Sequence, residues 1–353
     1  MNVNNKKIEE KFAKSQNALV LQQSDLSLKS ISDMVSDGSI DISPKYQRRE
    51  RWNELKESGL IESFLLNIPV PPIYLAEDEY GTYSVIDGKQ RLIAINKFLK
   101  DELKLKKLEK FPELEGIFFS ALPTPLSNAL KIRPYLRVVT LLRQSDSDLK
   151  HEVFLRLNKA GVALNSQEIR NVAFRGGFND LLFKLSENEY FVQQLGSKKG
   201  TKIYEEMTDV QFVLRFFTVK EYWKEFPGNM DVAMDRFMSA HYKLKDDKIS
   251  ERKQEFLTAL NFVKEIWGKD AFMKPNASKR ILQGFYDIEM VCASLLNEAE
   301  RKKAVENATV VRQKLDEALK FDLEFLESVT QFTSNPRNVF YRINKFTDLL
   351  KEI

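Results

Sequence analysis

The chain has 353 residues, 43% of them hydrophobic and 30% charged, which is typical of a folded globular protein. The net charge of +4 is mildly basic, and a surface of mixed charge explains it as well as nucleic-acid binding does. No apolar run approaches the roughly 20 residues that cross a bilayer. The polar segment 1–14 does not resemble a secretion signal, so we expect a cytoplasmic protein with no membrane partner.

Cysteine and histidine are scarce, which excludes several kinds of site. Cys292 is the only cysteine, so the chain can form neither an internal disulfide nor a cysteine zinc cluster. His151 and His241 are the only histidines and lie far apart in the chain, which argues against His-rich metal sites and an HNH-type nuclease. Apolar neighbours predict that Cys292 lies in the core of a helix.

The first part of the chain is divided into short elements, because eight of the eleven prolines lie at or before Pro134. Asn53 is a plausible helix cap, and the helix after it would turn Leu55, Leu60 and Phe64 inward. In chain order, periodicity predicts a helix at 5–22, a short element at 26–35, a strand at 40–42, the helix after Asn53, strands at 73–76 and 82–86, a helix at 89–99, and strands at 103–108 and 135–142.

After about residue 146 the apolar spacing becomes helical. Thr208 has capping-box spacing relative to Gln211 and is expected to begin a helix. The other predicted helices cover residues 148–157, a segment that opens at Asn165, and residues 299–329 and 339–353. We therefore predict an α/β domain followed by an all-helical one.

A turn that begins at Asp87 joins a predicted strand to a predicted helix. Gly88 permits unusual backbone angles and close approach of a ligand. The free N–H groups and dipole of the helix start favour an anion, to which Lys89 and Arg91 add positive charge and Gln90 an amide. Asp87 would bind Mg²⁺ or orient a water molecule beside a phosphate. An ordinary Asp-Gly turn with solvated charges explains the same residues equally well.

Arginines also cluster upstream of this turn. Arg48, Arg49 and Arg51 follow Gln47 in a polar loop. Guanidinium groups bind phosphate through forked hydrogen bonds, so this loop is a candidate phosphate contact. The alternative is a solvated polar loop.

A third polar group lies in the helical part of the pattern. Arg156 interrupts an apolar helix end and Asn158 follows it. Glu168 either faces a ligand or closes a capping box on Asn165, and these two roles are equally well supported. Arg170 either pairs with Glu168 or faces the ligand.

Six motifs in order resemble the ParB-like family named for the GmrS part of the modification-dependent restriction enzyme GmrSD. The family's Asp-Gly-Gln-Gln-Arg turn begins here at Asp87, with Lys89 in place of the first glutamine, so that position keeps a donor and loses an acceptor. The other motifs are Pro-x-(Tyr/Phe)-Gln-Arg…Trp at 44–52, Ile-Pro-(Ile/Val)-Pro at 68–71, Phe-x-Arg-Leu-Asn at 154–158, Leu-x-x-x-Glu-x-Arg-Asn at 164–171 and Leu-Arg-Phe at 214–216.

The resemblance implies a ParB/sulfiredoxin-like α/β fold with a small mixed sheet and an N-terminal helix over residues 1–146. An all-α domain over residues 147–353 would complete the site and bind DNA or a partner. The resemblance also implies nucleotide binding and hydrolysis at the turn, in bacterial defence against foreign DNA. In two-part members an HNH nuclease cuts the DNA. The two histidines here do not provide for one, so cleavage would come from the ParB-like domain or from a partner.

Our leading hypothesis is a nucleotide-dependent defence protein that hydrolyses an NTP, cleaves DNA, or does both with Mg²⁺. The catalytic residues would be Asp87, which also binds the metal, Arg91 and Glu168. The phosphates would be held by Gln47, Arg48, Gly88, Lys89, Gln90, Arg156, Asn158 and Arg170.

Two alternatives use the same residues. The first is a non-catalytic module that binds nucleotide or DNA phosphates and regulates a partner nuclease. The second is a basic DNA-binding protein without a nucleotide role. The residues leave open the preferred nucleotide and the oligomeric state. The hypothesis that the three polar groups form a single site requires that their side chains converge in one cleft. The side chains concerned are Arg48, Asp87, Arg91, Arg156 and Glu168.

Overall fold

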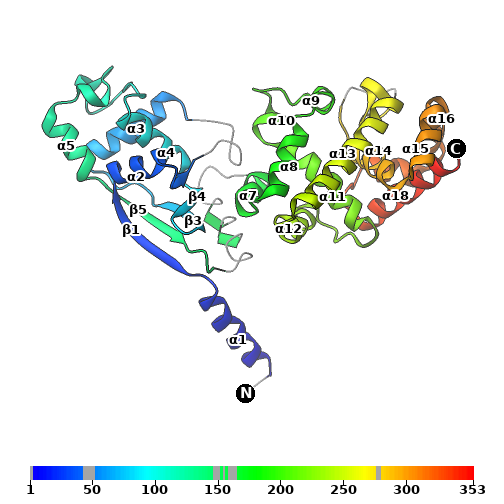
Figure 1. Ribbon diagram of the computed structural model, residues 1–353, viewed down its shortest axis with the longest axis horizontal. Coiled ribbons are helices and arrows are strands. Elements are labelled where there is room, and N and C mark those ends of the chain that lie inside the picture. The colour runs from blue at the N-terminus through cyan, green and yellow to red at the C-terminus, as the bar shows by residue number, and fades with distance from the viewer. Residues whose placement is uncertain (1–2, 43–51, 146–151, 154–155, 158–164, 276–279) are drawn as a thin grey trace. The chain divides into compact units, whose positions relative to one another are not determined.

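The computed structural model divides into two compact units, residues 1–173 and 174–353, which we call the sheet unit and the helical unit (Figure 1). It describes residues 3–42, 52–145, 152–153, 156–157, 165–275 and 280–353. The division falls later than the domain boundary expected after residue 146. The segment that opens at Asn165 therefore packs with the sheet unit.

A small mixed sheet organises the first unit, as predicted. Among the described residues its strands are β1 (Leu21–Ser27), β2 (Ile40–Asp41), β3 (Ile73–Glu79), β4 (Thr82–Asp87) and β5 (Tyr135–Leu141), in the spatial order β1-β5-β3-β4-β2. The pairs β1/β5 and β3/β4 are antiparallel, whereas β3/β5 and β2/β4 are parallel. Strand β4 therefore lies inside the sheet and ends at the predicted turn.

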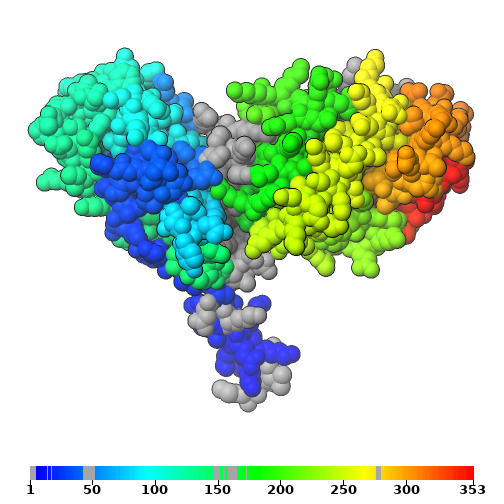
Figure 2. Space-filling view, in the orientation of Figure 1, coloured from blue at the N-terminus to red at the C-terminus, as the bar shows by residue number. Residues whose placement is uncertain are grey.

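Helices cover both faces of this sheet. The helices of the unit that are described from end to end are α1 (Val3–Asn17), α2 (Leu28–Ser36), α3 (Glu54–Leu65), α4 (Lys89–Leu99), α5 (Thr124–Ile132) and α7 (Ser166–Ala173), with short 3-10 turns at Pro112–Leu114 and Phe119–Ala121. Helices α2 and α5 form part of the surface in view in Figure 2. Successive strand residues point to opposite faces, so the sheet contributes to two separate apolar clusters.

The end of β4 shows this division clearly. Val85 packs into the main core, which includes residues of α2, α3 and α4. Ile86, the next residue, points to the other face and shares a small cluster with Ala76, Leu141 and Ile169. Since Ile169 belongs to α7, this helix covers the second face of the sheet beside the end of β4.

Several local predictions were wrong. The helix expected over 5–22 ends at Asn17, and β1 follows it. Residues 103–108 bury Leu105 in the core but form no strand, because their backbone bonds with Ile117 and Gly116 instead of a sheet neighbour. Leu55 is exposed, although Asn53 caps α3 as predicted, with Oδ1 accepting from the Lys56 N–H at 3.0 Å.

The second unit is helical, as expected. Its described helices are α8 (Gly177–Ser186), α9 (Glu189–Leu195), α10 (Lys202–Glu205), α11 (Thr208–Tyr222), α12 (Met230–His241), α13 (Asp246–Trp267), α14 (Gln283–Leu295), α15 (Glu298–Glu306), α16 (Ala308–Phe321), α17 (Leu323–Thr330) and α18 (Pro336–Lys351), with 3-10 turns at Trp223–Glu225 and Gly268–Asp270. Helix α14 is central, because it packs against α11, α13, α17 and α18 and is buried over most of its length. Cys292 is buried in it, which confirms the core prediction.

Two details of this unit differ from the sequence pattern. The expected helix over 299–329 is broken near Asn307 and at Asp322, whose carboxylate caps α17 by accepting from the Phe325 N–H at 2.9 Å. The capping box predicted at Thr208 is absent, because Met207 takes the N-cap position in a left-handed conformation without a side-chain cap. No helix in the part of the chain that the structure describes has the length and apolar character needed to cross a membrane.

Candidate nucleotide-binding site

Gly88 forms the junction between β4 and α4. Its φ of 99° lies in the left-handed region, where side chains are disfavoured, and no side chain caps α4. A Cβ at this position would overlap the Cδ1 atom of Ile73 and would come within 3.3 Å of Arg91 Nη2. Both the conformation and the lack of space therefore require glycine. The close packing also fixes the direction in which α4 begins.

Arg91 holds the turn to the preceding proline segment. Its Nη1 group donates to the carbonyl oxygens of Pro71 and Pro72, and its Nη2 group donates to Asp87 Oδ2 at 2.7 Å. Only 11% of its side chain is exposed. Burial lowers the pKa of the guanidinium, while the neighbouring Asp87 opposes that shift. These bonds give Arg91 a positioning role, and its catalytic role stays a prediction.

Asp87 is the accessible carboxylate of the turn. Its side chain is 42% exposed, and the Oδ2 atom is bonded to Arg91. Within the described ranges no group of three or more His, Cys, Asp or Glu side chains is arranged to hold a metal ion. Mg²⁺ is commonly held by one or two protein carboxylates together with substrate phosphates and water, so Asp87 fits a metal that arrives with a nucleotide.

Lys89 and Gln90 occupy the first turn of α4. Lys89 is buried and Gln90 is half-buried, so the positive end of this helix is recessed. Gln90 Oε1 accepts a hydrogen bond from the Trp52 N–H at 3.1 Å. This bond holds Trp52, the first described residue after the arginine-rich segment, beside the turn. Gln47 and Arg48, the predicted phosphate contacts of that loop, lie outside the described residues.

Glu168 closes a capping box at the start of α7. Its Oε2 atom accepts from the Asn165 N–H at 2.7 Å, and Asn165 Oδ1 accepts from the Glu168 N–H at 2.9 Å. Only 2% of Glu168 is exposed. The capping role of Glu168 is therefore confirmed. Its catalytic role stays a prediction and would use the same buried carboxylate.

These elements belong to one family domain. Residues 31–175 match the sequence model of a family described as GmrSD restriction endonuclease, N-terminal domain. This segment is a GmrSD N-terminal domain. It begins within α2 and ends close to the end of the sheet unit, so the match includes the turn and α7. No curated protein and no solved structure matches the chain.

Within the GmrSD N-terminal domain, α7 lies next to the turn through an apolar contact. Ile169 packs in the same cluster as Ile86, the residue before Asp87. Arg170 follows Ile169 and is fully buried, with its Nη1 group 3.4 Å from Gln167 Oε1. Packing thus brings α7 beside the end of β4, but the phosphate contact predicted for Arg170 remains a prediction.

Arg156 is in a different environment from Arg170. Its side chain is 77% exposed and its Nε group donates to Glu152 at 2.6 Å. The adjacent Leu157 and the earlier Val153 pack against the Ile86 cluster. Asn158 lies outside the described residues. Arg156 therefore faces solvent, and the phosphate contact predicted for it stays a prediction.

The residues that hold the turn in place were not predicted from the sequence. Ile73 packs against Gly88, and the carbonyl groups of Pro71 and Pro72 accept from Arg91. The Ile-Pro-Val-Pro motif was the available signal, because a proline-rich segment keeps its carbonyl oxygens free of helical hydrogen bonds. In this structure the motif and the adjoining Pro72 provide two acceptors for Arg91.

Proposed function

We propose that the turn from Asp87 to Arg91 binds the phosphate groups of a nucleotide and that the protein acts in nucleotide-dependent defence against foreign DNA in the cytoplasm. The observation that carries this proposal is the match of residues 31–175 to the GmrSD restriction endonuclease N-terminal domain, which includes the whole turn. Defence and action on DNA follow from the family's description.

The geometry of the turn supports phosphate binding. Gly88 begins α4 without a side-chain cap, and the N-terminus of a helix attracts anions through its N–H groups and dipole. Lys89 adds positive charge to the first turn, and Gln90 adds a hydrogen-bonding amide. In the proposed complex these residues hold phosphate oxygens, with Gln47 and Arg48 closing the site from the loop that ends at Trp52.

The chemistry proposed for this site is hydrolysis of a phosphate ester or anhydride. Asp87 orients the attacking water or holds Mg²⁺, and Arg91 keeps the Asp87 carboxylate in position through the Nη2–Oδ2 bond. When bound, Mg²⁺ would neutralise charge that develops on the phosphate oxygens. Arg156, Asn158 and Arg170 are further proposed phosphate contacts, and Glu168 of α7 is the second proposed carboxylate.

We also propose that the sheet unit has a ParB/sulfiredoxin-like fold. The support is the mixed strand order β1-β5-β3-β4-β2 together with a strand-to-helix turn at the end of an interior strand. In the same proposal the helical unit binds DNA, or a partner such as a nuclease.

A non-catalytic sensor is the second candidate function. The ion pair between Asp87 and Arg91 favours it, because a carboxylate that already neutralises a guanidinium attracts a metal ion less strongly. Such a module would bind the nucleotide through the same turn and would regulate a partner nuclease without turnover.

Phosphate release from a panel of NTPs, with and without DNA, tests the proposal. Asp87→Asn retains the size of the side chain and should abolish turnover, and Arg91→Ala should also abolish it. Asp25→Asn is the matched control, because Asp25 lies on β1 in an exposed pair with Arg137. Nucleotide binding without turnover in the wild type would support the sensor. Turnover that persists in Asp87→Asn would refute the catalytic role of Asp87.

A further inference from the structure

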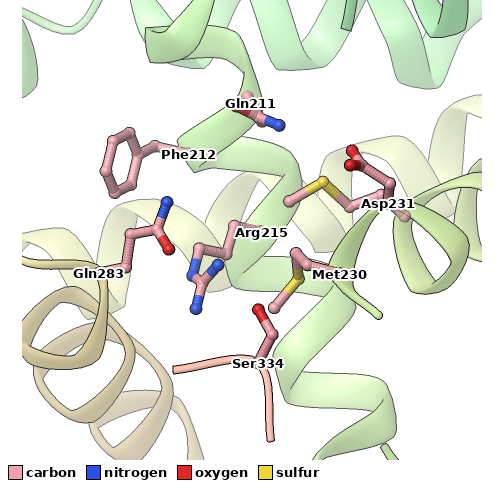
Figure 3. A pocket seen from close by; sticks show the side chains of 8 residues that line it. Gln211, Phe212, Arg215, Met230, Asp231, Gln283 and Ser334 are labelled. Atoms are coloured by element: carbon pink, nitrogen blue, oxygen red, sulfur yellow. The ribbon is translucent and has the colours of Figure 1, made fainter. Parts of the chain in front are cut away.

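The helical unit contains a small cavity with a buried arginine in its wall. The cavity has a volume of about 190 Å³ and lies outside the segment that matches the GmrSD family. Its lining residues come from α11, α12, α14 and the segment before α18: Gln211, Phe212, Arg215, Met230, Asp231, Met234, Gln283 and Ser334. Figure 3 shows the guanidinium of Arg215 between the side chains of Gln283 and Ser334.

Arg215 belongs to a buried group of three charges. Its Nε and Nη2 groups donate to the two oxygens of Asp287 at 2.7 and 2.8 Å. Arg342 also donates to Asp287 Oδ2, and its Nη1 group donates to the carbonyl oxygen of Ser328 at 3.1 Å. The side chains of Arg215, Asp287 and Arg342 are 3%, 0% and 0% exposed. Two guanidinium groups thus share one carboxylate.

This arrangement leaves positive charge directed at the cavity. The two bonds to Asp287 use Nε and Nη2 of Arg215, and within the described residues Nη1 has no hydrogen-bond acceptor. Because Arg215 is nearly buried and lines the cavity, an anion placed there would accept from Nη1 and compensate the second guanidinium. A buried charge that lacks compensation is costly, so binding of an anion would relieve that cost.

Three helices also begin at this cavity. Helix α12 begins at Met230, α14 begins at Gln283, and Ser334 directly precedes Asn335, the N-cap of α18. Met230, Gln283 and Ser334 are part of the cavity lining. Helix starts carry partial positive charge, so their convergence strengthens the attraction for an anion at the same point.

The remaining lining residues limit the size and charge of a ligand. Phe212, Met230 and Met234 form apolar wall, and the exposed Asp231 contributes one negative charge. Cavities that hold drug-sized ligands measure roughly 300–1,000 Å³. The smaller volume here fits one compact group, and Asp231 disfavours ligands with several negative charges.

We propose that this cavity of the helical unit binds a single phosphate-type oxyanion, through Arg215 Nη1 with Gln283 and Ser334. The group would be either free phosphate or the phosphate of a mononucleotide. The proposal is independent of the nucleotide site at the Asp87 turn, because it rests on residues of the helical unit alone.

Gln283→Glu tests the proposal without disturbing the buried ion pairs. A carboxylate at the first residue of α14 is favourable for that helix but repels an anion in the cavity. Gln254→Glu is the matched control, because it makes the same charge change at an exposed position of α13 outside this cavity. Isothermal titration calorimetry with inorganic phosphate, at constant ionic strength, should show at least tenfold weaker binding in Gln283→Glu and wild-type binding in Gln254→Glu.

The same titrations in a Lys89→Met background separate this cavity from the turn at Asp87. Phosphate binding that survives Lys89→Met and is lost on adding Gln283→Glu is the expected result. Tighter binding of AMP than of phosphate would identify a nucleotide as the source of the group, and equal or weaker binding would identify free phosphate. The proposal is overturned if the Lys89→Met protein binds no phosphate, or if adding Gln283→Glu to it leaves phosphate binding unchanged.

Discussion

Arg91 Nη2 donates at 2.7 Å to the carboxylate of Asp87, which lies four residues earlier in the chain. The same guanidinium reaches back to the carbonyl groups of Pro71 and Pro72. The strand end, the helix start and the proline segment are therefore joined by one buried side chain. In this arrangement Arg91 determines where the Asp87 carboxylate lies, and Asp87 presents the accessible charge.

Replacing Gly88 should destabilise the sheet unit strongly. In Gly88→Ala the left-handed φ costs about 1–3 kcal/mol, and overlap with Ile73 adds about 1–3 kcal/mol. Gly81→Ala is the control, because Gly81 also has a positive φ, but a Cβ there would meet nothing within 4 Å. Urea denaturation should show the larger loss of unfolding free energy for Gly88→Ala.

A second substitution separates the two causes of that loss. Ile73→Val removes the Cδ1 atom that a Cβ at residue 88 would overlap. In the Ile73→Val background, Gly88→Ala should therefore cost at least about 1 kcal/mol less than in the wild type. Strictly additive effects of the two substitutions would show that the overlap with Ile73 does not contribute.

Arg91→Lys should destabilise the protein although it preserves the charge. Lysine cannot reproduce the forked contacts with Asp87, Pro71 and Pro72, so we expect a loss of about 2–4 kcal/mol in unfolding free energy. Arg137→Lys makes the same change in an exposed pair with Asp25 and should have little effect. Equal effects in chemical denaturation would contradict the positioning role of Arg91.

Two substitutions at Glu168 distinguish its capping role from catalysis. Glu168→Gln can still close the capping box and should retain wild-type stability, whereas Glu168→Ala should lose about 1 kcal/mol. If Glu168 also acts in hydrolysis, Glu168→Gln should lose phosphate release while its melting temperature stays unchanged. Wild-type turnover in Glu168→Gln would restrict this residue to the capping role.

Glu289 should make stability depend on pH. Burial raises the pKa of this carboxyl well above 4.5, although the Phe272 N–H donates to it and opposes the shift. Above pH 4.5 the unfolded chain therefore loses a proton that the folded protein retains. The contribution of Glu289 to stability is then present at low pH and falls as pH rises toward the folded pKa.

Glu289→Gln removes this titration, so its unfolding free energy relative to wild type should increase between pH 4.5 and pH 8. Glu298→Gln, at an exposed position of α15, should follow the wild-type profile. Urea denaturation across this pH range measures both effects. Parallel profiles for wild type and Glu289→Gln would contradict the raised pKa.

The features that sequence predicted well are those with local causes. Tyr83 and Val85 alternate with polar residues before an Asp-Gly break, and apolar spacing resumes at Leu92, so β4, the turn and α4 follow from neighbouring residues. Asn53 as a cap depends in the same way on residues within one helical turn. Cys292 was predicted correctly because its immediate neighbours in the sequence, Val291 and Ala293, are apolar.

The features that sequence missed depend on distant partners. Strand β1 is largely polar and exposed, and its pairing is with β5 more than a hundred residues later, as in Asp25 opposite Arg137. No local pattern marks it as a strand. Likewise, the Ile-Pro-Val-Pro motif indicates carbonyl groups that are free to accept hydrogen bonds, but only the fold shows that Arg91 is their donor.

The nucleotide affinities of two lysine variants at opposite ends of α4 test the central claim, phosphate binding at the Asp87 turn, most directly. Lys89→Met removes a positive charge at the start of the helix, and Lys100→Met removes one from its C-cap. Loss of a charge-assisted contact worth about 1.5–3 kcal/mol should weaken nucleotide binding roughly 10- to 100-fold in Lys89→Met. Lys100→Met should bind as wild type does. Equal affinities for both folded variants and wild type would contradict phosphate binding at this turn.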